Sequence, residues 1–411
     1  MKMLKGNMVV AQSGGPTAVI NASLAGVIQE ARKHTQIAGI YGLVHGIEGA
    51  LKEELIDLSL ESPQTVELLI QTPGSALGSC RHKLSDDDYD RILSLFKVHD
   101  VRYFVYIGGN DSMDTCHRIS ALAGSYGYEI QVMGVPKTVD NDLAYTDHTP
   151  GYGSAARFVA LATRDTGRDL ESMTTFDDVS ILETMGRNAG WLTASAVLGK
   201  VEEDEAPHLV YVPEVPFDEN QFLDDVTNIH GRLGRVFVVV CEGVRDVDGN
   251  YVGQQVLGSS GRDAFGHALP TLTAGVASYL SGIVGQRLGL RSRFLRPVLI
   301  GRGFTACVAE SDRREALLVG RQAVAQLVKG EGGFMITLQR VSDRPYESVT
   351  GLAPLAEVAN AEKLLPREYI NEAGNNINHG FFDYALPLVD GPFPPLARLK
   401  GARVGKQIAH H

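Results

Sequence analysis

Two aspartates and a lysine follow an apolar stretch of the chain, and their spacing suits acid–base chemistry. Residues 132–135 read as a buried strand, and Pro-Lys-Thr-Val-Asp-Asn-Asp follows at 136–142. Open parallel α/β sheets bind ligands at the carboxyl ends of their strands, so Lys137, Asp140 and Asp142 are expected at such an edge. One carboxylate could act as a base toward a hydroxyl while the other orients a group or a metal. The segment could equally be an Asx-rich turn that caps a helix.

Three glycine-rich turns each follow an apolar stretch. They are SGGPT at residues 13–17, GGNDS at 108–112 and MGRNAG at 185–190. Glycine lets backbone N–H groups approach a phosphate, and the N-terminus of a following helix adds partial positive charge. Any one turn could be a strand–helix connection without a ligand, but three in register with a parallel sheet are harder to explain without a phosphate. The turns contain neither GxGxxG nor GxxxxGK[ST], which argues against the usual dinucleotide and P-loop motifs.

The elements that must position these turns alternate between short apolar strands and helices, as is typical of a parallel α/β sheet. Strands are expected at residues 8–12, 39–43, 102–107, 132–135, 179–182, 208–212, 235–241 and 334–338, and helices at 18–33, 112–123, 154–169 and 312–329. A chain of 411 residues exceeds the usual size of one hydrophobic core. Two lobes are therefore expected, with the site in the cleft between them.

Composition and charge argue against several classes of partner. The net charge of −11 gives no overall attraction to nucleic acid or acidic membranes, so an anionic ligand needs local basic residues. The apolar stretch 272–290 contains Ser278, Ser281, Gln286 and Arg287 and is expected to be an amphipathic helix, not a membrane span. The N-terminus lacks the long apolar stretch of a signal peptide, and the four cysteines form no CxxC pair. We therefore expect a cytoplasmic location.

The motifs together resemble the phosphofructokinase family, and its pyrophosphate-dependent branch in particular. In order they are SGGPTAVINA at residues 13–22, GSCR at 78–81, GGNDS at 108–112, PKTVDND at 136–142, ETMGR at 183–187, VPEVPF at 212–217, CEG at 241–243 and a weaker LIGR at 299–302. The resemblance implies an α/β fold of two Rossmann-like, three-layer lobes. Residues 1–150 plus about 303–355 would bind the phosphoryl donor, and residues 151–302 plus about 356–411 would bind fructose 6-phosphate. It also implies a homo-oligomer, expected to be a dimer.

Family roles carry over to the matching positions. By this resemblance Asp140 is the base that takes the proton of the sugar 1-hydroxyl. Glu242 would accept hydrogen bonds from sugar hydroxyl groups, and Arg293 and Arg302 would hold the 6-phosphate. The sugar site is expected from Thr138, Val139, Asp140, Asp142, Met185, Gly186, Arg187, Glu242, Arg293, Leu299 and Arg302. The pyrophosphate site is expected from Gly14, Gly15, Arg81, Asp111 and Lys137, and the catalytic set from Asp140, Lys137, Asp111, Arg187 and Thr138. Phosphoryl transfer needs in-line positioning and positive charge around the phosphoryl oxygens, which the basic residues would provide.

Two of these positions predict the donor. ATP-dependent relatives carry glycine where this chain has Asp111 and Lys137. A carboxylate at Asp111 would take the space and charge of a nucleotide α-phosphate, which disfavours ATP and tolerates pyrophosphate. Lys137 would place positive charge on the leaving phosphate. The resemblance thus implies a reversible, Mg²⁺-dependent transfer from pyrophosphate to fructose 6-phosphate, which forms fructose 1,6-bisphosphate and orthophosphate.

Three positions depart from the family pattern. Asn110 replaces an aspartate associated with magnesium, although an amide oxygen can still ligate Mg²⁺. Asp178 stands where ATP-dependent relatives have a phosphate-binding arginine of a neighbouring subunit, and its charge would repel a sugar phosphate. Leu299 brings no polar group to the sugar site. These departures leave open a catalytically weak, sugar-phosphate-binding regulatory protein of the same fold. An ATP-dependent kinase is a third hypothesis, which Asp111 opposes.

Overall fold

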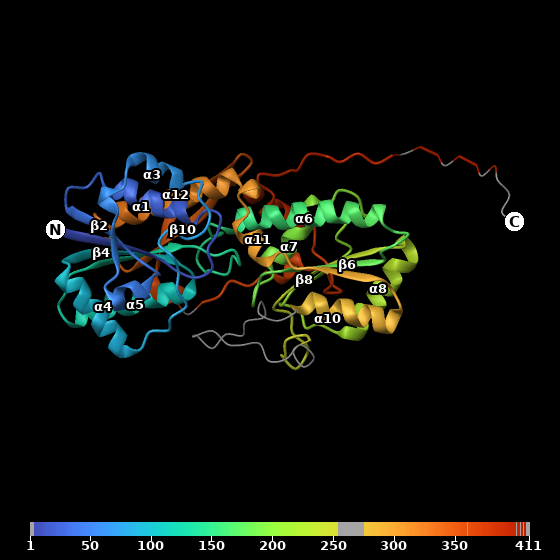
Figure 1. The fold of residues 1–411 in the computed structure, drawn as a ribbon, viewed down its shortest axis with the longest axis horizontal. Helices are drawn as coiled ribbons and strands as arrows, with labels where there is room; N and C mark the ends of the chain where they lie inside the picture. The colour runs from blue at the N-terminus through green and yellow to red at the C-terminus, as the bar shows by residue number, and fades with distance from the viewer. Residues whose placement is uncertain are drawn as a thin grey trace.

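The computed structural model describes residues 4–253, 275–359 and 361–399, together with 401–402, 404–405 and 407. Their strands form two sheets, one toward each end of the molecule (Figure 1). The seven-stranded sheet consists of β1 (Gly6–Gln12), β2 (Ile37–Leu43), β3 (Leu55–Asp57), β4 (Val101–Gly108), β5 (Gln131–Pro136), β10 (Phe334–Asp343) and β11 (Tyr346–Pro354). The four-stranded sheet consists of β6 (Val179–Thr184), β7 (Leu209–Tyr211), β8 (Val236–Cys241) and β9 (Ser292–Leu295).

Helices cover both sheets. They are α1 (Ile20–Ala31), α2 (Ile47–Lys52), α3 (Pro63–Leu69), α4 (Asp86–Val98), α5 (Asn110–Ser125), α6 (Tyr152–Ser172), α7 (Trp191–Ala194), α8 (Glu219–Leu233), α10 (Gly275–Ile283), α11 (Val298–Gly303), α12 (Glu310–Leu327), α13 (Leu355–Val358) and α14 (Gly380–Ala385). A π-helical turn, η4 (Val284–Leu288), extends α10.

The seven-stranded sheet has the strand order β11-β10-β5-β4-β1-β2-β3, and only its edge pairs β10–β11 and β2–β3 are antiparallel. One core lies between this sheet and the helices α1 and α12, and a second lies on the opposite face against α4 and α5 (Figure 1). Burial on both faces explains why β1, β4 and β5 are almost continuously apolar. The turns after these three strands therefore meet at one edge of the sheet.

The four-stranded sheet is parallel throughout, in the order β7-β8-β6-β9. Its helix α6 packs on one face, while α8 and α10 pack on the other (Figure 1). The turns after β6 and β8 lie at its carboxyl edge, because the two strands pair in register as far as Thr184 and Cys241.

The strands and helices expected from the sequence are all present, with ends that shift by a few residues. The expectation did not include β3, β9 or β11, which are edge strands with weaker apolar patterns. Of the stretch 272–290, residues 275–288 are helical as expected, and residues 272–274 lie outside the described residues. In the part of the chain described here, no helix is long and apolar enough to cross a membrane. Where each lobe begins and ends along the chain stays a prediction.

Candidate active site

The loop after β5 carries the lysine and the aspartates singled out in the sequence. Lys137 directly follows the strand and is only 4% exposed. Its Nζ atom donates a hydrogen bond to the carbonyl oxygen of Gly15, 3.2 Å away in the turn after β1. Further along the loop, the backbone N–H of Asp140 donates to Oγ1 of Thr138 at 3.1 Å. The loop therefore lies against the first glycine-rich turn.

Asn141 fixes the shape of this loop. It is fully buried and has a left-handed backbone conformation with a φ of 57°, which asparagine tolerates better than most residues. Its Oδ1 accepts a hydrogen bond from the backbone N–H of Thr149 at 3.1 Å, and its Nδ2 donates to the hydroxyl oxygen of Tyr384 at 2.9 Å. The Thr149 hydroxyl donates in turn to the carbonyl oxygen of Thr138 at 2.9 Å. The aspartates on either side of Asn141 are thus carried by a well-anchored turn.

The turn after β1 brings two cationic side chains together. Gly14 has a φ of 76°, and a Cβ atom there would lie 2.7 Å from Nζ of Lys137. A Cβ atom on Gly15 would lie 2.9 Å from Nη1 of Arg302. Burial lowers the pKa of Lys137 to about 8, and the positive charges of Arg302 and Arg81 contribute to this shift. Four of the five residues expected to bind pyrophosphate therefore lie near one another.

The fifth residue lies at the start of α5. Asp111 is exposed in the first helical turn, where the partial positive charge of the helix N-terminus favours a carboxylate. Its neighbour Asn110 has a buried Oδ1 without a hydrogen-bond partner among the described residues. Because an unpaired buried acceptor is costly, this oxygen is suited to contact a ligand.

The turn after β6 packs tightly against the turn after β8. Sγ of Cys241 donates to the carbonyl oxygen of Gly186 at 2.7 Å. A Cβ atom on Gly243 would lie 1.9 Å from the carbonyl oxygen of Arg187, so only glycine permits this approach. Glu242 is 4% exposed, and Arg187 is close enough for its charge to lower the pKa of Glu242, against the larger effect of burial. The two turns form one unit that places Arg187 and Glu242 together.

Burial dominates the electrostatics of the carboxylates. It raises the pKa of Asp140, while the charges of Arg187 and Lys137 oppose the shift. Burial and the Asp140 charge together raise the pKa of Asp142 to about 7 and that of Glu242 to about 8. One oxygen of Asp140, Oδ1, is buried and has no hydrogen-bond partner in the described part of the chain. A buried carboxylate with a raised pKa and an unpaired oxygen is suited to take a proton from a hydroxyl.

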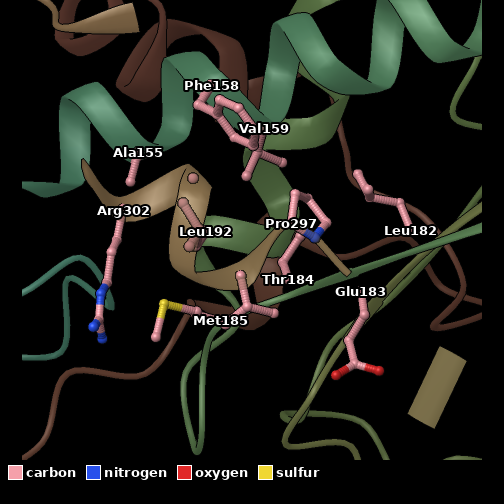
Figure 2. A pocket seen from close by; sticks show the side chains of 12 residues that line it. Ala155, Phe158, Val159, Leu182, Glu183, Thr184, Met185, Leu192, Pro297 and Arg302 are labelled. Atoms are coloured by element: carbon pink, nitrogen blue, oxygen red, sulfur yellow. The ribbon is translucent and has the colours of Figure 1, made fainter. Parts of the chain in front are cut away.

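Arg302 lies between the two sides of the site. A small apolar pocket lies between α6, the end of β6 and α11. Phe158, Met185 and Arg302 are among the residues that line it (Figure 2). Burial lowers the pKa of Arg302, and the charges of Asp140 and Glu242 oppose this shift. The Arg302 guanidinium therefore lies beside Gly15 and is close enough to Asp140 and Glu242 to interact with their charges.

Of the residues expected to bind the sugar, Arg293 lies on β9 and Leu299 lies on α11. Arg293 is paired with Ser180 of β6, and its Nε atom donates to Asp177 at 2.7 Å. Ser180 lies about 13 Å from the carboxyl end of β6, at about 3.3 Å per residue. Leu299 lies on α11 and is 66% exposed. Arg293 therefore lies away from the cluster around Asp140 in the single chain, whereas Leu299 precedes Arg302 by three residues on the same helix.

The negative charge of Asp178 is balanced by a neighbouring arginine. Asp178 forms an ion pair with Arg291 at 2.7 Å, and Arg291 directly precedes β9. Hydrogen bonds from the Arg291 side chain lower the pKa of Asp178 to about 2. The repulsion of a sugar phosphate that the sequence suggested at this position is thus offset by a cation.

Sequence reasoning missed Glu362 and Lys363, which lie beside the loop after β5. The Nδ2 atom of Asn188 donates to Oε1 of Glu362 at 3.0 Å, and the backbone N–H of Lys363 donates to the carbonyl oxygen of Asp142 at 2.8 Å. After burial and Asp140, the charge of Glu362 adds to the raised pKa of Asp142. Neither residue belongs to a glycine-rich turn or follows a strand, so no local pattern marked them.

Known proteins resemble this chain over most of its length. The phosphofructokinase family model matches residues 7–327. A Xanthomonas campestris protein named pyrophosphate–fructose 6-phosphate 1-phosphotransferase is 42% identical over 95% of this chain and 93% of its own length. A sulfofructose kinase of Alkalicoccus urumqiensis is 35% identical over 89% of this chain and 92% of its own. The crystal structure of a pyrophosphate-dependent phosphofructokinase from Marinobacter aquaeolei has a TM-score of 0.84 at 40% identity and covers 98% of both chains. The chain therefore belongs to the phosphofructokinase family.

Proposed function

We propose that the protein transfers a phosphoryl group from pyrophosphate to the 1-hydroxyl of fructose 6-phosphate, forming fructose 1,6-bisphosphate and orthophosphate. The observation that carries this proposal is the buried Lys137, whose Nζ atom lies against the Gly14–Gly15 turn on the same loop as Asp140. It brings positive charge for a small phosphate donor next to a base for the acceptor. Relatives and a solved structure at about 40% identity are named for the same reaction.

On the acceptor side, Asp140 would take the proton of the 1-hydroxyl as oxygen attacks phosphorus. Its raised pKa, caused by burial, favours this role. Thr138, Val139 and Asp142 would flank the acceptor on the same loop. The turns after β6 and β8 would bind the sugar through Met185, Gly186, Arg187 and Glu242. The unpaired Oε2 of Glu242 would accept a hydrogen bond from a sugar hydroxyl group.

On the donor side, Lys137, Arg81 and Arg302 surround the turn after β1. Cations at this position would stabilise the charge on the phosphoryl oxygens and on the leaving phosphate. Asp111, in the first turn of α5, would exclude the additional phosphate and nucleoside of ATP by like charge. The Arg302 guanidinium lies against Gly15, so it would act on the transferred phosphoryl group as well as on the sugar phosphate.

Magnesium fits this site through oxygen atoms. Mg²⁺ prefers octahedral oxygen ligands and keeps phosphate and water oxygens in its shell, so it needs few protein groups. The buried, unpaired Oδ1 of Asn110 is a suitable protein ligand. When bound, the ion would neutralise negative charge on the donor.

A homodimer would complete the sugar site. Because Arg293 lies away from Asp140 within one chain, its expected contact with the sugar phosphate would come from a second copy of the chain. A cytoplasmic location suits an enzyme that acts on sugar phosphates and reversibly exchanges pyrophosphate and orthophosphate.

Purified protein tests the proposal with two donors and two acceptors. Turnover with pyrophosphate, Mg²⁺ and fructose 6-phosphate should exceed turnover with ATP by at least about tenfold, which corresponds to about 1.4 kcal/mol in transition-state stabilisation. Sulfofructose is the second acceptor to compare, because a relative is named for it and because Leu299, on the helix that carries Arg302, departs from the family pattern. Sugar-phosphate binding without turnover with either donor would instead favour the regulatory protein.

A further inference from the structure

A short segment near the C-terminus lies against both halves of the site. Glu362 pairs with Leu143 in an isolated antiparallel bridge, just after the loop that carries Asp140. The backbone N–H of Lys363 donates to the carbonyl oxygen of Asp142 at 2.8 Å. This segment lies beyond residue 327, where the match to the family model ends. We refer to residues 362–365 as the brace segment.

The side chain of Lys363 binds the loop after β5, at residues 137–147, which carries Asp140. Its Nζ atom donates to Oδ1 of Asn141 at 3.3 Å and to the carbonyl oxygens of Thr146 and Asp147 at 3.2 and 2.7 Å. The ammonium group also lies 5.0 Å from the centre of the Trp191 ring, a cation–π geometry. One cation thus joins the beginning and the end of the loop that presents Asp140.

The same segment holds the sugar-binding turn. Oε1 of Glu362 accepts a hydrogen bond from Nδ2 of Asn188, the residue after Arg187, at 3.0 Å. The carbonyl oxygen of Lys363 accepts a hydrogen bond from Nε1 of Trp191 at 3.0 Å. Farther along, the backbone N–H groups of Leu365 and of Gly190 both donate at 2.8 Å to Oε1 of Glu214. The brace segment therefore contacts the turn at residues 186–191 through Asn188 and Trp191, and shares Glu214 with Gly190.

We propose that Lys363 and Glu362 are positioning residues that set the distance between Asp140 and Arg187. This proposal rests on the proposed function. The loop follows β5 of one sheet and the turn follows β6 of the other, so neither ladder of strand hydrogen bonds fixes their separation. The brace segment spans the two by direct hydrogen bonds. A misplacement of about 1 Å between reacting groups can cost about a hundredfold in rate.

Two pairs of variants test the proposal. Lys363→Met removes the ammonium group that binds the loop. Lys329→Met, at an exposed lysine, is its matched control. Glu362→Ala removes the acceptor of Asn188, whereas Glu362→Gln keeps an oxygen that can accept the same hydrogen bond. We expect kcat with pyrophosphate and fructose 6-phosphate to fall at least about tenfold in Lys363→Met and in Glu362→Ala, with KM for pyrophosphate within about twofold of wild type. Glu362→Gln should restore most of kcat, and Lys329→Met should match wild type.

Hydrogen–deuterium exchange of peptides covering residues 137–147 and 185–191 gives a readout without turnover. Both peptides should exchange faster in Lys363→Met and Glu362→Ala than in wild type, while peptides from β1 and β4 should not change. Since the Glu362 side chain is exposed, its variants should fold even if Lys363→Met does not. Unchanged exchange at both peptides, an unchanged kcat in Glu362→Ala, or a Glu362→Gln variant as impaired as Glu362→Ala would overturn the proposal. An inactive wild-type protein with the expected exchange differences would refute the proposed function and leave the brace supported.

Discussion

The Nζ atom of Lys137 donates a hydrogen bond to the carbonyl oxygen of Gly15, 3.2 Å away and 122 positions earlier in the chain. The contact is possible because β5, β4 and β1 are neighbours in one parallel sheet, so that the loop after β5 and the turn after β1 emerge at the same edge. It places the buried cation of the loop after β5 beside the turn expected to bind the donor.

Removing this cation should impair use of pyrophosphate. Lys137→Met keeps the length of the side chain and removes its charge from the donor turn. One such contact in the transition state is worth about 3 kcal/mol, so kcat/KM for pyrophosphate should fall on the order of a hundredfold. The measurement is steady-state kinetics with pyrophosphate varied, with the exposed Lys329→Met as control. A Lys137→Met enzyme within threefold of wild type would show that Lys137 has no part in the reaction.

Shortening Asp111 should open the site to ATP. The Asp111 carboxylate lies at the N-terminus of α5, the position where a nucleotide phosphate would meet like charge. In Asp111→Gly we expect kcat/KM for ATP to rise and kcat/KM for pyrophosphate to fall, since the residue would also orient the smaller donor. Measuring both donors in both proteins checks this. If neither value changes, or if wild type already prefers ATP, the donor is selected elsewhere in the site.

Asp140→Asn should abolish most turnover while leaving the sugar bound. The amide keeps the shape of the carboxylate but cannot take a proton, so kcat should fall by about two orders of magnitude or more. KM for fructose 6-phosphate should change little, because Arg187 and Glu242 are untouched. Near-normal kcat in this variant would remove Asp140 from the role of base.

Some of the residues identified from the sequence lie in turns after strands. Lys137, Asp140 and Arg187 come one to four residues after β5 or β6, and an apolar run followed by glycine or by a polar turn marks such positions locally. The fold was predictable for the same reason, since β1, β4 and β5 are buried on both faces and are almost continuously apolar. Arg81, Arg293 and Arg302 were identified through the family resemblance alone.

The remaining site residues depend on distant contacts. Lys363 bonds Asn141 across 222 positions, and Glu362 bonds Asn188 across 174. No periodicity or turn chemistry at residues 361–365 specifies these partners. The position of Arg293 could not be predicted from the sequence either. The register of the short edge strand β9 against β6 decides at which end of the sheet Arg293 lies.

Asn110→Asp should strengthen the binding of magnesium. The unpaired Oδ1 of Asn110 is the protein oxygen that would ligate the ion, and a carboxylate would add a negative charge there. Activity of wild type should be lost in chelator and regained with Mg²⁺, and the variant should reach half-maximal activity at a lower Mg²⁺ concentration. Full activity in excess chelator would rule out a metal requirement. An unchanged Mg²⁺ dependence in the variant would place the ion away from residue 110.

A buried histidine next to the catalytic loop predicts a pH-dependent stability. Nδ1 of His148 lies 2.8 Å from Oδ2 of Asp147, and its Nε2 lies 2.7 Å from Oε2 of Glu315. The hydroxyl group of Tyr346 donates to the other oxygen of Glu315, and Arg340 bonds Asp147. Although burial lowers the pKa of His148, the two carboxylates more than offset it and raise the pKa from 6.5 to about 9.

The sign of the effect follows from this shift. The folded protein holds a proton on His148 that the unfolded chain releases above pH 6.5, so the stabilisation is complete below that pH and is lost as the pH rises through 9. Between pH 6.5 and 8 the loss should be about 2 kcal/mol. Above pH 8 the lowered pKa values of Lys137 and Lys363 act in the opposite direction, which makes the lower range the informative one.

Urea unfolding at several pH values between 6.5 and 8 measures the effect in wild type and in His148→Gln. The variant should be less stable at pH 6.5, because Asp147 and Glu315 lose their shared cation, and its stability should fall less steeply with pH. The buried Asp142 and Glu242 also titrate in this range, but they are present in both proteins and cancel in the comparison. His379→Gln, at an exposed histidine, should retain the wild-type slope. Parallel curves for wild type and His148→Gln would show that His148 is not held in its charged form by the two carboxylates.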